Sequence, residues 1–266
     1  MLPHEISLTA GKKLFFASDF HLGAPNLATS HERERKIVRW LDSITDEAAY
    51  IFLLGDVFDF WFEYRHAVPR GYVRLLGKLA SMVDQGIPIV MFSGNHDIWM
   101  WDYFPQELGI PVLHKPASFT SGGKNFHIGH GDGLGPGDYW FKAVKKVFRN
   151  PFFQWLYARI HPNLGIGLAQ SLSRRSRASS GEEEYTFMGK EEWLWQYADG
   201  LQEGNPHDYY IFGHRHLPMD LPVTNGGRYL NLGEWFHHCT YGEFDGNDLV
   251  LRAFEQPMPV LPNFEK

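Results

Sequence analysis

The sequence predicts a layered α/β fold, because short apolar runs alternate with helical segments along its 266 residues. The apolar runs are rich in β-type residues and end in Gly, Asp, Asn or His. The links between elements are short and contain glycine. Such alternation is typical of right-handed crossover units built on one sheet. We expect a single domain over residues 1–266, with a helical insertion at residues 139–181 inside it.

In the first half of the chain, the apolar pattern switches between strand and helix spacing. The expected helices are residues 31–41 and 70–85. The expected strands are residues 13–19, 50–54 and 87–92, with two more within 112–130 joined at Ser121-Gly-Gly. Charged residues 32–36 are expected to be a solvated helix face. Gly86 should end the second helix, because glycine readily adopts the left-handed conformation found there.

The composition changes at residue 139. Residues 139–181 contain eight Lys or Arg and no Asp or Glu, so they carry +8 of a chain total of −6, and the remainder sums to −14. Apolar residues recur at helical spacing in this segment, with breaks expected at Pro151 and Pro162. Beyond it we expect a helix at residues 190–202. The expected strands there are residues 209–212, 228–232 and 241–254.

Composition excludes several classes of protein. A hydrophobic content of 44% provides for a large core, and a pI near 6.1 argues against a generally basic nucleic-acid binder. Cys239 is the only cysteine, which excludes an intramolecular disulfide and a cysteine-based metal cluster. The first residues lack a signal-peptide pattern, and no run of about 18 apolar residues occurs. We therefore expect a cytoplasmic protein without an obligate protein partner, with any membrane contact peripheral.

Five expected strands end in polar side chains. The motifs, in chain order, are Asp19-x-His21, Gly55-Asp56-x-x-Asp59, Gly94-Asn95-His96-Asp97, Gly129-His130-Gly131-Asp132 and Gly213-His214-Arg215-His216. Ligand sites of α/β sheets lie beyond the carboxyl ends of the strands, so we expect these motifs at one rim. A single Asp after a strand is more often a helix cap, and a single His more often structural. Five such motifs together are difficult to explain in that way.

Seven of these residues are candidate metal ligands. They are Asp19, His21, Asp56, Asn95, His130, His214 and His216. Carboxylate, imidazole and amide oxygen suit divalent first-row metals, and manganese, iron and zinc fit about equally well. Seven ligands are too many for one ion, whereas two ions about 3.5–4 Å apart would use them all. The sequence therefore predicts two-metal chemistry at phosphorus.

This ordered set of motifs resembles the calcineurin-like metallophosphoesterase family. The resemblance implies a four-layer α/β/β/α sandwich with two metals, and manganese is the metal it favours. One ion would be held by Asp19, His21, Asp56 and His216. The other would be held by Asp56, Asn95, His130 and His214, with Asp56 bridging the two. His96 would lie beside the scissile phosphate as general acid or transition-state stabiliser, with Asp59 orienting its imidazole.

Within that family, three stretches are similar to the subfamily of UDP-2,3-diacylglucosamine diphosphatases of lipid A biosynthesis. They are Leu54-Gly-Asp-Val-Phe-Asp-Phe-Trp61, His130-Gly-Asp-Gly-Leu134 and Ser173-Arg-Arg-Ser176. The resemblance implies hydrolysis of a pyrophosphate bond to give UMP and 2,3-diacylglucosamine 1-phosphate (lipid X). The substrate contacts it implies are Asn95, His96, Asp138, Ser176 and His214.

The chain departs from that subfamily at two positions. It has His96 where the subfamily has Arg, and Glu183 where an ungapped alignment places a substrate-binding Lys. These departures leave the two-metal site intact but keep one alternative open, a two-metal phosphoesterase acting on a soluble nucleotide, cyclic nucleotide or other phosphoester. A second alternative is a non-catalytic scaffold with a vestigial metal site, against which the intact ligand set and the Asp59/His96 pair argue.

Residues 139–181 combine cations with aromatic residues. Charged helices are usually solvated faces and aromatic residues at helical spacing are usually core, but charge of one sign suits contact with anionic headgroups. By resemblance the insertion covers the site and holds acyl chains. The aromatic residues expected in that groove are Trp140, Phe141, Phe148, Phe152 and Trp155. The cations expected at its membrane-facing rim are Lys142, Lys145, Lys146 and Arg149. We thus expect a lipid-linked sugar nucleotide and an anionic inner-membrane surface as partners, and no nucleic acid.

Overall fold

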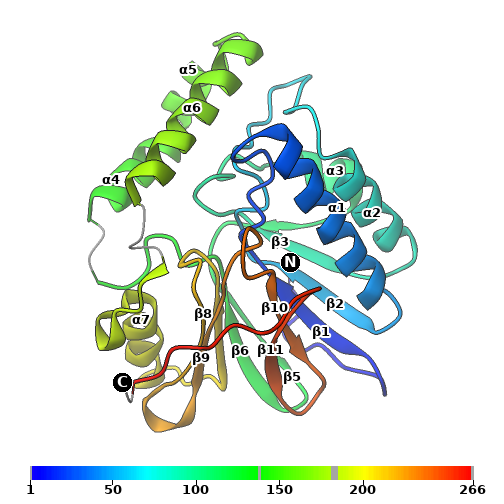
Figure 1. Cartoon of the computed structure of the whole chain (residues 1–266), viewed down its shortest axis with the longest axis vertical. Coiled ribbons are helices and arrows are strands. Elements are labelled where there is room, and N and C mark those ends of the chain that lie inside the picture. Colours follow the sequence, from blue (N-terminus) through cyan, green and yellow to red (C-terminus); the bar gives the residue numbers. More distant parts are fainter. Residues whose placement is uncertain (1, 137–138, 181–184, 265–266) are drawn as a thin grey trace.

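Two β-sheets lie face to face between layers of helices in the computed structural model, which describes residues 2–136, 139–180 and 185–264 (Figure 1). The six-stranded sheet has the order β11 (Leu249–Ala253), β10 (Thr240–Phe244), β1 (Lys13–Ala17), β2 (Ala48–Leu53), β3 (Ile89–Phe92) and β4 (Val112–Leu113). The five-stranded sheet has the order β5 (Ala117–Ser121), β6 (Lys124–Ile128), β7 (Tyr209–Phe212), β9 (Arg228–Leu232) and β8 (Pro218–Pro222). Strands β1 to β4 are parallel, as are β6, β7 and β9.

Helices cover the outer face of each sheet. Those on the six-stranded sheet are α1 (Leu27–Ile44), α2 (Val73–Asp84) and α3 (Tyr103–Leu108). The five-stranded sheet is covered by α7 (Trp193–Gln202), which follows the short 3-10 turn η2 (Gly189–Glu191); a second such turn, η3 (Thr224–Gly226), links β8 and β9. The helices α4 (Tyr139–Phe148), α5 (Pro151–Tyr157) and α6 (Pro162–Ser180) project away from the sheets, and we call them the helical arm (Figure 1).

The central strands β1, β2, β3 and β7 are almost entirely apolar because their residues are buried on both faces of the sheets. In β1, Phe15 packs in the cluster beneath α1 and α2, whereas its neighbour Phe16 packs between the two sheets. The inter-sheet layer includes a run of stacked rings, in which Phe16 meets Phe52 and Phe126. A third cluster joins α7 to the outer face of β7, β8 and β9. These three apolar layers confirm the expected α/β/β/α architecture.

The arm meets the rest of the protein at a small aromatic cluster. Phe60, Phe62, Ile98 and Trp99 are buried there, and Tyr157, Ile166 and Ala169 of the arm pack against them. We call this set the arm-contact cluster. Trp99 Nε1 also donates a hydrogen bond of 2.8 Å to the Phe148 carbonyl at the end of α4. Within the described ranges, no helix has both the length and the apolar character needed to cross a bilayer.

Several elements differ from the sequence-based expectation. Residues 112–130 contain three strands, β4, β5 and β6, rather than two, and α3 was not predicted. Residues 241–254 form a hairpin of β10 and β11 rather than one strand. Strand β8 was not predicted, and its prolines at 218 and 222 are unusual in a strand interior. The structure places β8 at the edge of its sheet, where a missing amide donor costs no ladder hydrogen bond.

Charged residues 32–36 are not simply a solvated face, so that prediction was wrong. Arg33 and Glu34 are only 7% and 1% exposed. Glu34 Oε1 accepts hydrogen bonds from the amides of Arg74 (2.9 Å) and Leu75 (3.1 Å) in the first turn of α2. The residue preceding α2, Tyr72, provides no side-chain cap. A carboxylate of α1 therefore caps α2 across the helix–helix interface.

We predict that Glu34→Ala lowers the free energy of unfolding by about 1–3 kcal/mol, because two amide donors lose their acceptor in a buried position. Chemical denaturation with urea provides the measurement. The exposed neighbour Glu32 is the matched control, and Glu32→Ala should change stability by no more than about 0.5 kcal/mol. Equal stability of the two variants would contradict the proposed cap.

Candidate active site

All seven predicted metal ligands meet at one edge of the two sheets. Asp19 and His21 follow β1, Asp56 follows β2, and Asn95 follows β3. In the second sheet, His130 follows β6, and His214 and His216 follow β7. These strands run parallel within their sheets, so their carboxyl ends deliver the side chains to a common place.

One half of the cluster contains Asp19, His21, Asp56 and His216. The Nε2 atoms of His21 and His216 lie 3.0 Å apart. Asp19 Oδ1 is 3.4 Å from His216 Nε2, and Asp56 Oδ2 is 3.7 Å from His21 Nε2. All four residues are buried. Two imidazole nitrogens and two carboxylates thus point toward a common centre.

The other half contains Asp56, Asn95, His130 and His214. Asp56 Oδ2 is 3.3 Å from His130 Nε2. Asn95 Oδ1 lies 3.0 Å from His130 Nε2 and 2.9 Å from His214 Nδ1. The same Asp56 oxygen therefore faces histidines of both halves, which is the position that a bridging carboxylate requires.

The electrostatics of the cluster favour added positive charge. Burial opposes ionisation of Asp56, but the nearby His130 and His96 outweigh it and hold its pKa well below the usual range. Burial lowers the pKa of His130, yet Asp56 outweighs this effect and raises that pKa to about 10. Burial lowers the pKa of His21 to about 3 and that of His214 to about 4, so both rings favour the neutral form that binds metals. The donors present therefore fit divalent cations.

Five of the seven candidate ligands have left-handed backbone conformations. They are Asp19 (φ 54°), His21 (φ 42°), Asp56 (φ 50°), His214 (φ 70°) and His216 (φ 54°). Each such residue costs of the order of 1–3 kcal/mol and persists only where surrounding structure enforces it. Concentration of this strain in one cluster is typical of a functional site.

Two glycines allow the loops to approach the ligands closely. A Cβ atom at Gly94 would overlap the Asp56 carboxylate, and one at Gly213 would overlap Asp19 Oδ2 and Ser18 Oγ. Asp97 completes the first of these loops, because its carboxylate accepts hydrogen bonds from the amides of Gly94 (2.7 Å) and Phe58 (3.3 Å). Burial and the nearby Asp56 raise the pKa of Asp97 to about 7.

Buried arginines hold the two loops that carry pairs of ligands. Arg33 donates hydrogen bonds to the carbonyls of Phe20 (2.7 Å), His21 (2.6 Å) and Ala24 (2.6 Å). Arg215, between the two histidines of the β7 loop, forms a two-pronged ion pair with Glu192 at 2.9 and 3.0 Å. Neither role was anticipated. The spacing of charges along a helix or loop carries no signal that a side chain turns inward to bind carbonyls.

His96 lies next to Asp59, as expected, but a third residue joins them. His96 Nδ1 is 3.6 Å from Asp59 Oδ1, 3.2 Å from the Asp59 carbonyl and 3.0 Å from Ser173 Oγ of α6. Ser173 donates to Asp59 Oδ1 at 3.0 Å. Because a hydroxyl has one proton, Ser173 then accepts from His96 Nδ1–H. That arrangement leaves His96 Nε2 as the nitrogen available to a substrate.

Ser173 is the site residue that sequence reasoning missed. It lies in the Ser-Arg-Arg-Ser stretch that pointed to the subfamily, three residues before the predicted contact Ser176. The side chain of Ser176 and all of Asp138 lie outside the described residues. His96 also belongs to a group with His21 and Asp59 whose ligand atoms lie within 4.8 Å of one another. A role in metal binding is therefore the alternative to a catalytic role for His96.

Residues 12–218 match the family model described as calcineurin-like phosphoesterase. The chain belongs to this family. It is 40% identical over 263 residues to the UDP-2,3-diacylglucosamine hydrolase of Porphyromonas gingivalis, and the match covers 91% of this chain and 98% of that protein. It is 26% identical over 246 residues to the enzyme of the same name from Shewanella baltica, covering 92% and 99% of the two chains.

A solved structure is also similar. The crystal structure of a protein from Streptococcus pneumoniae, described as a predicted phosphoesterase, covers 96% of this chain and 97% of its own. The identity is 13% and the TM-score is 0.42, which is too low to add to the family assignment.

We predict that Arg33→Met weakens metal binding by about 10–100-fold, because the loop carrying Asp19 and His21 loses the donor that fixes three of its carbonyls. Metal content after dialysis against graded chelator provides the measurement. Arg35→Met, an exposed position in the same helix, is the matched control and should bind metal like the wild type. A folded Arg33 variant with unchanged metal affinity would contradict this role.

Proposed function

We propose that this chain hydrolyses the pyrophosphate bond of UDP-2,3-diacylglucosamine, releasing UMP and 2,3-diacylglucosamine 1-phosphate in lipid A biosynthesis. The observation that carries the proposal is the 40% identity to a hydrolase of that name over nearly the whole of both chains. The seven clustered ligand candidates and the adjacent His96 supply a site suited to the reaction.

The site would hold two divalent cations, with manganese as the proposed metal. Asp19, His21, Asp56 and His216 would bind one of them. The second would be bound by Asp56, Asn95, His130 and His214. When bound, the two ions would neutralise charge on the phosphoryl group and activate a water for in-line attack. The buried carboxylates and the neutral rings of His21 and His214 suit this role, and His130 would bind on losing its proton.

His96 would assist at the leaving side of the phosphoryl group. The Asp59 carbonyl and Ser173 fix its Nδ1–H, so the ring presents Nε2 in one orientation. A proton or hydrogen bond from Nε2 would stabilise negative charge that develops on a phosphate oxygen. Since Ser173 belongs to α6, the helical arm takes part in orienting this histidine.

The arm is suited to an acylated substrate. Phe152 and Trp155 are 62% and 53% exposed, and Leu164 and Leu168 are exposed as well. Phe152 stacks against Trp155, yet both remain open to solvent. Exposed apolar side chains in such number mark a lipid, membrane or partner contact. We assign them to the acyl chains and the adjacent bilayer surface, with the arm acting as a lid.

We predict that His96→Ala lowers kcat by about 10²–10⁴ while both metals remain bound, which is the range for loss of a general acid. Ser173→Ala should lower kcat by about tenfold and alter the pH–rate profile, because the ring loses one of two orienting contacts. Ser171→Ala on the same helix is the control. Loss of bound metal in the His96→Ala variant would instead show that His96 is a metal ligand.

The substrate assignment is tested by comparing kcat/KM for the diacyl sugar nucleotide with that for UDP-glucosamine and for bis(p-nitrophenyl) phosphate. We expect a preference of several orders of magnitude for the diacyl compound, because each buried CH₂ contributes about 0.8 kcal/mol. A chelator should abolish all three activities, and manganese should restore them. Equal efficiency on the acylated and non-acylated nucleotides would favour a soluble phosphoester as substrate.

A further inference from the structure

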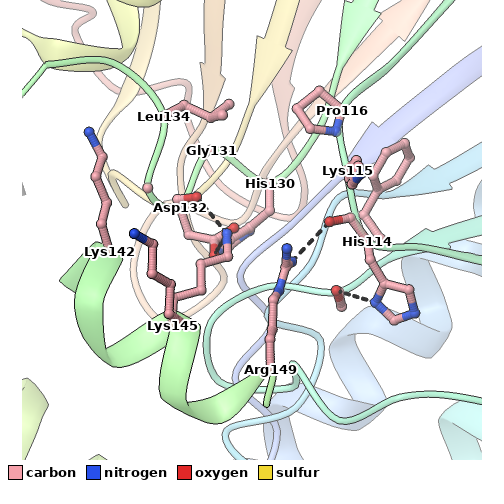
Figure 2. A pocket seen from close by; sticks show the side chains of 14 residues that line it. His114, Lys115, Pro116, His130, Gly131, Asp132, Leu134, Lys142, Lys145 and Arg149 are labelled. Carbon is pink, nitrogen blue, oxygen red and sulfur yellow. Dashed lines mark hydrogen bonds and ion pairs between the residues drawn. The ribbon is translucent and has the colours of Figure 1, made fainter. Parts of the chain in front are cut away.

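A cavity of about 570 Å³ opens beside His130, between α4 and the loops that follow β4 and β6 (Figure 2). Its volume is within the usual range for small-molecule sites. Among the described residues, five cations line it, namely Lys115, Lys142, Lys145, Lys146 and Arg149, together with one carboxylate, Asp132. The cavity is therefore strongly positive and adjoins the candidate metal cluster through His130.

The cations of α4 point toward this cavity, in contrast to the membrane-facing rim expected from the sequence. Lys145 forms an ion pair with Asp132 and donates to its carbonyl at 2.8 Å. Lys142 donates to the Gly135 carbonyl at 2.6 Å, and Arg149 donates to the His114 carbonyl at 2.9 Å. Figure 2 shows Lys145 of α4 and Arg149, which directly follows this helix, reaching toward the loops that carry His130 and His114.

The site has a polar side and an apolar side. In the part of the chain that the structure describes, no residue lining the cavity belongs to the arm-contact cluster. Phe60 of that cluster directly follows Asp59, and Ile98 lies two residues after His96. Acyl chains are disfavoured in the cavity, since they would displace water from ammonium and guanidinium groups. A phosphate-bearing polar group would be attracted there, because Lys and Arg bind phosphate oxygens through charge-assisted hydrogen bonds.

We propose that this cavity binds the nucleoside monophosphate half of the substrate, a placement that rests on the proposed function. The scissile pyrophosphate then lies at the cluster, with its nucleotide side on the His130 face. Its sugar and acyl side extends past His96 toward the arm-contact cluster. Pro116 and Leu134 supply apolar contacts for the base and ribose, and Lys146 and Arg149 approach the phosphate.

The proposal is tested by titrating manganese-loaded full-length protein with UMP, glucosamine 1-phosphate and inorganic phosphate in a calorimeter. Arg149→Ala and Lys146→Ala should each weaken UMP binding by about tenfold, the effect of losing one charge-assisted contact. Glucosamine 1-phosphate should bind as it does to the wild type, whereas inorganic phosphate should be weakened along with UMP, because Lys146 and Arg149 contact the phosphate. Arg159→Ala, an exposed cation of the arm outside the cavity, is the matched control.

Three outcomes would overturn the placement. Unchanged UMP binding in both folded variants would show that the cavity does not hold the nucleotide. Greater weakening of glucosamine 1-phosphate than of UMP would assign the cavity to the sugar phosphate. If the two variants lose binding to phosphatidylglycerol vesicles but bind UMP like the wild type, Lys146 and Arg149 contact the membrane surface instead.

Hydrolysis by the wild type separates this inference from the proposed function. If the protein cleaves the diacyl sugar nucleotide and the variants bind UMP normally, the function stands and the nucleotide cavity fails. If the protein does not cleave that compound but Arg149→Ala and Lys146→Ala still weaken UMP binding, the proposed function fails. The cavity would still be a nucleotide site, and the protein would act on a different phosphoester.

Discussion

Asp19 and Asp56 place two carboxylates in the buried seam where the two sheets meet, and an ionised carboxylate away from water is costly unless it is paired. The structure meets this constraint with imidazoles from both sheets. His21 belongs to the first sheet, whereas His130 and His216 come from the second. Because the partners are divided in this way, the cluster can form only when the two sheets pack with their carboxyl ends together.

The loops around the carboxylates are held in place by groups outside the cluster. Arg33 reaches from α1 to the carbonyls around His21, and Arg215 is fixed by Glu192 beside α7. These contacts offset the left-handed conformations of the ligand residues. Both helical layers thus contribute to the geometry of the central site, although neither supplies a predicted ligand.

The helical arm gives the site two chemically different flanks. Its first helix lines a cavity with Lys and Arg, and its later helices expose aromatic and aliphatic side chains. A substrate with an anionic nucleotide at one end and acyl chains at the other matches this division. The arm also reaches the candidate site directly through Ser173, so placement of the arm and orientation of His96 are physically linked.

The sequence by itself determined the layered fold and the position of the candidate ligands, because strands buried on both faces are mostly apolar and a sheet gathers their carboxyl ends. Motifs such as Gly55-Asp56 and Gly213-His214 mark those ends locally. Only the tertiary structure decided which way α4 turns its cations, that Glu34 and Arg33 are buried, and that Ser173 bridges Asp59 and His96. Charge and helical spacing specify a face of a helix. What that face meets depends on packing between elements far apart in the chain.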